Sequence, residues 1–101
     1  MAFKDNLEAL PQVSGNALIL LDDSGIEVAR IANGPGTAGS FRVYAWLAGK
    51  WGGINAEAAE EGLRLYAEHT EDARMNPGKH PNIDRLIEIL RSGKAKRAVL
   101  E

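Results

Sequence analysis

Most of the side chains that could take part in chemistry lie in one stretch of the chain, residues 66–86. Both histidines, His69 and His80, fall in it, close in sequence to carboxylates and to a lysine. A histidine beside a carboxylate can serve as a general base or as a ligand. The positive end of a helix expected to start near Ile83 would also attract an anion. We call this region the polar corner, and its candidate ligand-binding residues are His69, Asp72, Lys79, His80, Asn82, Asp84 and Arg85.

The spacing of these residues matches no metal or catalytic motif. The two histidines lie on either side of a turn, without an H-x-x-x-H pair or a fixed third ligand, so the sequence predicts no metal site. Serines and threonines are present, but no nucleophile elbow marks one of them as reactive. We therefore assign no catalytic residue and no cofactor from the sequence.

The polar corner has two interpretations. In the first it is a site for a small anionic ligand, to which Lys79 or Arg85 adds positive charge. In the second it is a structural hinge, because two prolines fix φ and a glycine between them permits a tight reversal. We predict that Lys79 and His80 are functional groups directed at solvent. His69, next to apolar neighbours, is instead expected to be half buried and hydrogen-bonded within the fold.

A glycine-rich segment precedes one of the expected helices. Gly34, Gly36 and Gly39 fit the pattern G-x-G-x-x-G, which holds a pyrophosphate when it joins a strand to a helix. The preceding strand, however, belongs to an expected hairpin, and the chain is too short for a doubly wound sheet. No lysine follows Gly39, which excludes a Walker A loop. We interpret the segment as a flexible connection, with Ser40 as the cap of the next helix.

The strands are predicted from apolar runs and turn signals. The run Ala17–Leu21 is followed by Asp-Asp-Ser-Gly, a type I turn sequence, which predicts a hairpin with a return strand over Ile26–Ala32. A last strand is expected within residues 95–100, beside the first strand, which has the composition of a strand buried on both faces. A short helix is expected over Lys4–Leu10, before a proline.

Three longer helices are expected near residues 40–50, 56–74 and 83–91. Asn55 is placed to cap the second helix and Asn82 to cap the third. The sequence therefore predicts an α+β fold in a single domain: a small antiparallel or mixed three-stranded sheet, made of the hairpin and the C-terminal strand, packed against three main helices. The predicted core consists of Leu18, Leu20, Val28, Phe41, Tyr44, Leu63, Tyr66, Ile83, Leu86, Ile87 and Leu90.

The helix expected near residues 40–50 is apolar nearly all round. The face opposite Phe41 and Tyr44 carries an aromatic ring with a cation one turn before and one turn after it, and that face needs a partner. Another helix of the same domain, a second subunit or a ligand could cover it. The candidate interface residues on this face are Arg42, Val43, Trp46 and Lys50.

Composition limits the class of protein. The 101 residues include twelve basic and fourteen acidic side chains, a formal charge of -2, so we expect neither nucleic acid nor a membrane as partner. The absence of cysteine excludes disulfides and thiolate chemistry. The sequence shows no basic and apolar leader and no apolar run of the roughly 18 residues that a membrane span needs. We expect a cytoplasmic protein.

The runs YAEHT at residues 66–70 and NPGKHPNIDRL at residues 76–86, together with Asp5-Asn6-Leu7 near the start, resemble a small family of uncharacterised bacterial proteins, a domain of unknown function. The resemblance covers essentially the whole chain. It implies a bacterial cytosolic protein made of one domain of about this length, and it implies no activity, cofactor or catalytic residue.

Two hypotheses for the function follow. The favoured one is a non-enzymatic binding or interaction module that self-associates as a homo-oligomer, or binds a protein partner, through the helix that carries Trp46. The alternative is a small enzyme, or a binder of a small anionic ligand, that uses the polar corner.

Overall fold

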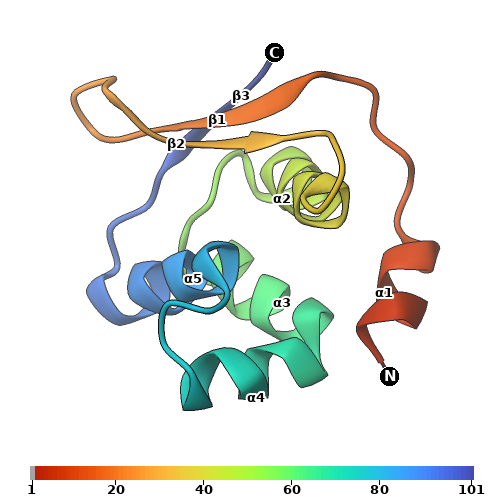
Figure 1. Cartoon of the computed structure of the whole chain (residues 1–101). Helices are drawn as coiled ribbons and strands as arrows, with labels where there is room; N and C mark the ends of the chain where they lie inside the picture. Colours follow the sequence, from red (N-terminus) through yellow and green to blue (C-terminus); the bar gives the residue numbers. More distant parts are fainter. Residues whose placement is uncertain (1) are drawn as a thin grey trace.

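The computed structural model describes residues 2–101 and has a sheet and helices in separate layers. Figure 1 shows the sheet on one side of α2, the helices α3, α4 and α5 on the other side, and α1 at the flank. This arrangement confirms the predicted α+β fold. The elements are α1 (Phe3–Ala9), β1 (Ala17–Leu21), β2 (Glu27–Ala32), α2 (Ala38–Trp51), α3 (Ala56–Tyr66), α4 (Glu68–Met75), α5 (Pro81–Ser92) and β3 (Arg97–Leu100).

The sheet is antiparallel, with strand order β2-β1-β3. β1 is the central strand and the C-terminal strand lies beside it, as predicted. The side chains of Leu18 and Leu20 are 2% and 0% exposed and belong to the core. Their partners on β2 are Ile31 and Ala29, so these residues of β2 share the inner face.

Val28 was expected in the core, and this expectation is wrong: its side chain is 48% exposed. Because side chains alternate along a strand and Ala29 faces inward, Val28 lies on the outer face. The register also shifts here, since Leu20 pairs with Ala29 while Leu21 pairs with Glu27. Val28 is therefore the extra residue of a β-bulge.

α2 lies between the sheet and α3, which explains why its sequence is apolar nearly all round. Phe41, Val43, Tyr44 and Leu47 are all nearly or fully buried. The helix begins at Ala38, earlier than predicted, and its N-cap is Thr37 instead of Ser40. Its C-terminal end is capped by a glycine in the left-handed conformation.

The single long helix expected over residues 56–74 is wrong, because the chain breaks between α3 and α4. The break is at Ala67, with φ 51° and ψ -116°. Neither glycine nor proline marks the break, and side chains satisfy the carbonyl groups that it frees. The Thr70 hydroxyl donates to the Leu63 carbonyl at 2.6 Å, and the Asn6 side-chain amide donates to the Leu65 carbonyl at 2.9 Å.

Asn55 caps α3 as predicted, since its side chain accepts a hydrogen bond from the amide of Ala58 at 2.8 Å. The cap predicted for α5 is wrong. Pro81 occupies the first helical position, where its fixed φ is favourable and its missing N–H does no harm, so the N-cap is His80 and Asn82 is the second residue of the helix.

Two core residues predicted on α5 lie nearer the surface. Ile83 and Leu86 are buried as expected, but Leu90 is 39% exposed and Ile87 is partly buried. The buried face continues instead through Ile89, because the helix turns Leu90 toward the rim formed by α3 and α4. No helix in residues 2–101 is long and apolar enough to cross a membrane.

Candidate ligand-binding site

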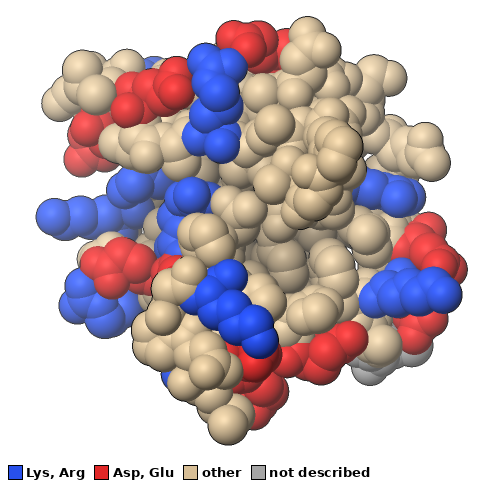
Figure 2. Space-filling view, in the orientation of Figure 1, with Lys and Arg blue, Asp and Glu red and all other residues tan. Residues whose placement is uncertain are grey.

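A cavity of about 310 Å³ lies where α2 and α5 begin and α3 ends. In the space-filling view the molecule is hollowed near the middle of one face (Figure 2). The glycine-rich segment before α2 and the first residues of α1 also contribute to its walls. In the described chain no carboxylate lines it. Its polar lining residues include Ser40, Tyr66, His69, Lys79, His80 and Asn82.

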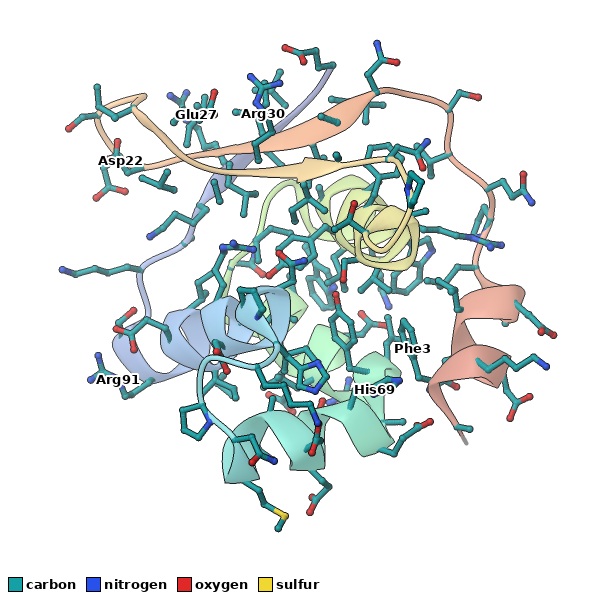
Figure 3. The ribbon with its side chains drawn as sticks, in the orientation of Figure 1. Phe3, Asp22, Glu27, Arg30, His69 and Arg91 are labelled. Atoms are coloured by element: carbon teal, nitrogen blue, oxygen red, sulfur yellow. The ribbon has the colours of Figure 1, made fainter. Side chains whose placement is uncertain are left out.

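His69 is positioned by the break at Ala67, because it is the second residue of α4. Its ring lies edge-on to Phe3, with ring centroids 5.2 Å apart, and 5.7 Å from the ring of His80. Figure 3 shows Phe3 and His69 side by side between α1 and α4. Neither ring nitrogen of His69 has a hydrogen-bond partner among residues 2–101. The imidazole of His69 is therefore available to a ligand.

Asp72 lies behind the cavity wall and holds two of the lining residues. Its Oδ2 atom is 2.6 Å from Nε2 of His80 and 2.9 Å from Nζ of Lys79. The hydrogen bond from His80 and then that from Lys79 lower the pKa of Asp72 to about 2, so the carboxylate is ionised at neutral pH. Since an ionised carboxylate only accepts, Nε2 of His80 carries the proton and Nδ1 is the ring nitrogen left for another partner.

A pair of hydroxyl groups forms another part of the wall. The hydroxyl of Tyr66 donates to Oγ of Ser40 at 2.7 Å. Burial raises the pKa of Tyr66 to about 12, so its hydroxyl stays protonated at neutral pH. Because Ser40 accepts from Tyr66, the proton of Ser40 remains free to be donated to a bound molecule.

Two helices begin at the cavity, and neither has a side-chain cap. The N-cap residues Thr37 of α2 and His80 of α5 both line the cavity, and the side chain of neither accepts a hydrogen bond from an amide of the first turn. In the described part of the chain the backbone amides of Ser40 and Asn82 also have no acceptor. Unpaired amides and the positive ends of two helix dipoles favour an anion at this place.

Partly buried contacts fix the start of α5. The hydroxyl of Tyr44 donates to the carbonyl of Asn82 at 2.5 Å. The guanidinium of Arg85 donates to Oδ1 of Asn82 at 2.8 Å and to the hydroxyl of Tyr44 at 3.3 Å. These bonds hold the first turn of α5, and with it the amide of Asn82, against α2.

The structure brings together most of the residues of the polar corner. His69, Lys79, His80 and Asn82 line one cavity, and Asp72 binds two of them from behind. The remaining two are supporting residues: Arg85 holds Asn82 and Tyr44, and the carboxylate of Asp84 accepts a hydrogen bond from the amide of Gly78 at 2.9 Å.

The hydrogen bonding of the two histidines is the reverse of the expectation. His80 is bonded to Asp72, whereas His69, which was expected to be satisfied within the fold, has no partner in the described residues. Sequence reasoning also missed Phe3, Ser40 and Tyr66 as lining residues. The only signal for them was a tyrosine hydroxyl on the otherwise apolar face of α3, because the other two come from distant parts of the chain.

The candidate interface residues on α2 have partners within one chain. Arg42 donates to the carbonyl groups of Leu10 and Pro11, which ties down the segment after α1. Val43 is 0% exposed, which corrects its assignment to a surface. Nζ of Lys50 lies 5.0 Å from the ring of Trp46, and Lys50 also forms a 3.0 Å ion pair with Glu61 of α3. Lys50 thereby contacts the Trp46 ring of its own helix and links this end of α2 to α3.

Within residues 2–101, no group of three or more histidine, aspartate or glutamate side chains is arranged to hold a metal ion. No curated protein and no solved structure matches this chain. A family model, DUF2322, described as an uncharacterized protein conserved in bacteria, matches residues 3–100. Because this match spans almost the entire chain, the resemblance of the two sequence runs is confirmed and the protein belongs to this bacterial family.

Proposed function

We propose that the protein binds a small anionic metabolite in the cavity beside the polar corner. The observation that carries this proposal is the composition of the lining. Two histidines and a lysine face one cavity of about 310 Å³, and no carboxylate lines it in the described chain. A concave site of this size with a few convergent polar groups is typical of small-molecule binding.

The groups around the cavity suit a phosphate or a carboxylate. The ammonium of Lys79, the hydroxyl of Ser40 and the unpaired amide of Asn82 can each donate a hydrogen bond to such an anion. His69 adds a donor in its neutral form and positive charge when it is protonated. The ion pair of Asp72 with Lys79 and the hydrogen bond that Asp72 accepts from His80 orient both side chains without placing negative charge on the cavity wall.

The apolar part of the lining suits the carbon skeleton of such a ligand. The rings of Phe3 and Tyr66 are stacked with centroids 5.1 Å apart, and together with Ile83 they form the apolar side of the cavity. A ligand with a short carbon chain or a ring beside its anionic group would contact both sides at once.

This proposal is favoured over a hinge without a ligand because of the groups left unpaired. A corner with only a structural role is expected to satisfy its partly buried polar groups internally. The ring nitrogens of His69 and the amides of Ser40 and Asn82 lack such partners in residues 2–101. The proposal concerns binding, and it assigns no catalytic step.

Thermal shift measurements with defined probes test the proposal. Inorganic phosphate and glycerol 3-phosphate should raise the Tm of the wild type in a concentration-dependent manner, whereas glycerol at the same concentration should not. His69→Leu and Lys79→Met should reduce the shift. Lys94→Met, which removes an exposed lysine outside the cavity, should leave the shift unchanged.

Two results would contradict the proposal. One is that neither phosphate nor a panel of small carboxylates and phosphate esters raises the Tm of the wild type. The other is a shift of the same size in the wild type and in both cavity variants, since the anion would then act on the whole surface.

A further inference from the structure

No helix within residues 2–101 covers the face of the sheet that points away from α2 (Figure 1). The central strand presents Ile19 and Leu21 on this side, because the alternate residues of β1 belong to the core. On the flanking strands Val28 and Val99 are 48% and 46% exposed. Figure 1 shows none of the described helices on this side of the sheet. Contiguous exposed apolar side chains of this kind mark an interaction surface.

The register gives this sheet face a definite charge pattern. Leu21 pairs with Glu27 on β2 and with Arg97 on β3, so one row across the sheet reads acidic, apolar, basic. Arg30 lies 3.2 Å from Glu27 and 2.5 Å from Glu101, which places both acids on the same face as Arg30. The side chains of Glu27 and Arg30 stand on the side away from the helices in Figure 3. Arg97 forms no ion pair within residues 2–101.

We propose that this face binds a second copy of the chain, sheet against sheet. In this dimer the twofold axis runs parallel to β1 and lies between the two sheets. The rotation leaves each residue at the same height along the strands and exchanges the two outer strands, so β2 of one copy lies over β3 of the other. Glu27 of each copy then lies opposite Arg97 of the other copy, an arginine that forms no ion pair among the described residues of its own chain. Ile19 and Leu21 pack on their own counterparts.

The charges favour a second copy over other occupants. The strands and the residue after β3 place two acids, Glu27 and Glu101, and two bases, Arg30 and Arg97, on this face, so the sheet itself contributes no excess of either sign. A polyanion or an anionic membrane would be attracted by an excess of basic groups, whereas a balanced and polar arrangement is complementary to itself. Three short strands give a patch below the usual size of a permanent interface, so the dimer forms reversibly.

Sedimentation equilibrium tests this proposal at protein concentrations from about 10 μM to about 1 mM, the range in which weak association is measurable. The apparent mass of the wild type should rise from 10.9 kDa toward twice that value. Val99→Lys should remain a monomer throughout. Met75→Lys, at a methionine that is 78% exposed on α4, should dimerise like the wild type. Circular dichroism checks that each variant is folded.

A second pair of variants tests the predicted orientation and does not depend on Val99. Glu27→Lys should weaken the dimer because it places a lysine opposite Arg97 of the other copy. Adding Arg97→Glu to that variant should restore the dimer. The proposal is overturned if the wild type stays at 10.9 kDa over the whole range. It is also overturned if Val99→Lys and Met75→Lys change the association equally.

Discussion

The Nε2 atom of His80 lies 2.6 Å from the Oδ2 atom of Asp72, and this contact joins α4 to the N-cap of α5. The same carboxylate holds Lys79, so one ionised group orients two cavity residues that follow each other in the turn. The contact therefore closes the corner between two helices, and in the proposed site it also fixes the position of the His80 ring at the cavity.

The contact predicts how stability depends on pH. The pKa of Asp72 is lowered from 3.8 to about 2, so its stabilising effect is present above the unfolded value and is lost as the pH falls through the folded value. At pH 7, Asp72→Asn should therefore melt below the wild type, and the difference should disappear near pH 2. The effect is modest, because the Asp72 side chain is 36% exposed and solvent screens the pair.

Melting curves by circular dichroism between pH 7 and pH 2 measure this difference. Asp23→Asn is the control, because Asp23 lies in the exposed hairpin turn and forms no hydrogen bond or ion pair in residues 2–101. A difference between Asp72→Asn and the wild type that stays constant down to pH 2 would show that the carboxylate charge is not the source of the effect.

A second prediction concerns the close approach of α3 to its neighbours at Gly62. A Cβ atom there would lie 2.7 Å from Cδ1 of Leu86 and 2.9 Å from Cδ1 of Leu47, and both leucines are 0% exposed. Overpacking of this kind costs about 1–3 kcal/mol, more than the roughly 1 kcal/mol that alanine gains over glycine in a helix. Gly62→Ala should therefore lower the free energy of unfolding.

Gly49 of α2 provides the matched control for Gly62. Apart from its two chain neighbours and the nearby backbone of its own helix, no atom of residues 2–101 lies within 4 Å of a Cβ added at Gly49, so Gly49→Ala should raise the free energy of unfolding by about 0.5–1 kcal/mol. Urea denaturation of the two variants and the wild type measures both effects. If Gly62→Ala is stabilised as much as Gly49→Ala, the helices are free to move apart and the contact is not tight.

Local signals were sufficient for much of the fold. The apolar run at Ala17–Leu21 and the turn after it predicted the hairpin, and Asn55 predicted the start of α3. The break at Ala67 could not be predicted, because no glycine or proline marks it and its stabilising bonds come partly from Asn6, far away in the sequence. The predicted burial also failed at Val28, where a β-bulge turns the side chain outward, and at Leu90, which lies at the rim of a helix.

The candidate site was predicted only in part, because local sequence signals show some of its residues and not others. The residues of the polar corner are close together in the sequence, so their convergence could be expected from one turn. The opposite wall was not expected, since Phe3 and Ser40 reach the cavity only through the packing of α1 and α2 against α3. A periodic pattern shows which face of a helix is apolar, and it does not show which two distant helix ends meet.

A third prediction concerns the backbone strain at Ala67. With φ 51° and ψ -116°, this alanine adopts a conformation that costs an L-residue about 1–3 kcal/mol. Ala67→Gly should relieve that strain and raise the free energy of unfolding by roughly 1 kcal/mol, even after the greater chain entropy of glycine is subtracted. Ala48→Gly, in the regular part of α2, should lower it. Equal losses in both variants would contradict a strained break.

The fourth prediction separates the anchoring of α5 from the chemistry of the cavity wall. Tyr44→Phe removes a buried donor to the Asn82 carbonyl, so it should cost about 1–3 kcal/mol and also reduce the Tm shift caused by phosphate, because the Asn82 amide is no longer held in place. Tyr66→Phe removes a hydroxyl whose acceptor, Ser40, lines the cavity and can be reached by water. It should lower the phosphate shift at a smaller cost in stability. Urea denaturation and thermal shifts with phosphate measure both quantities. A phosphate shift unchanged in both variants would show that the anion does not bind between α2 and α5.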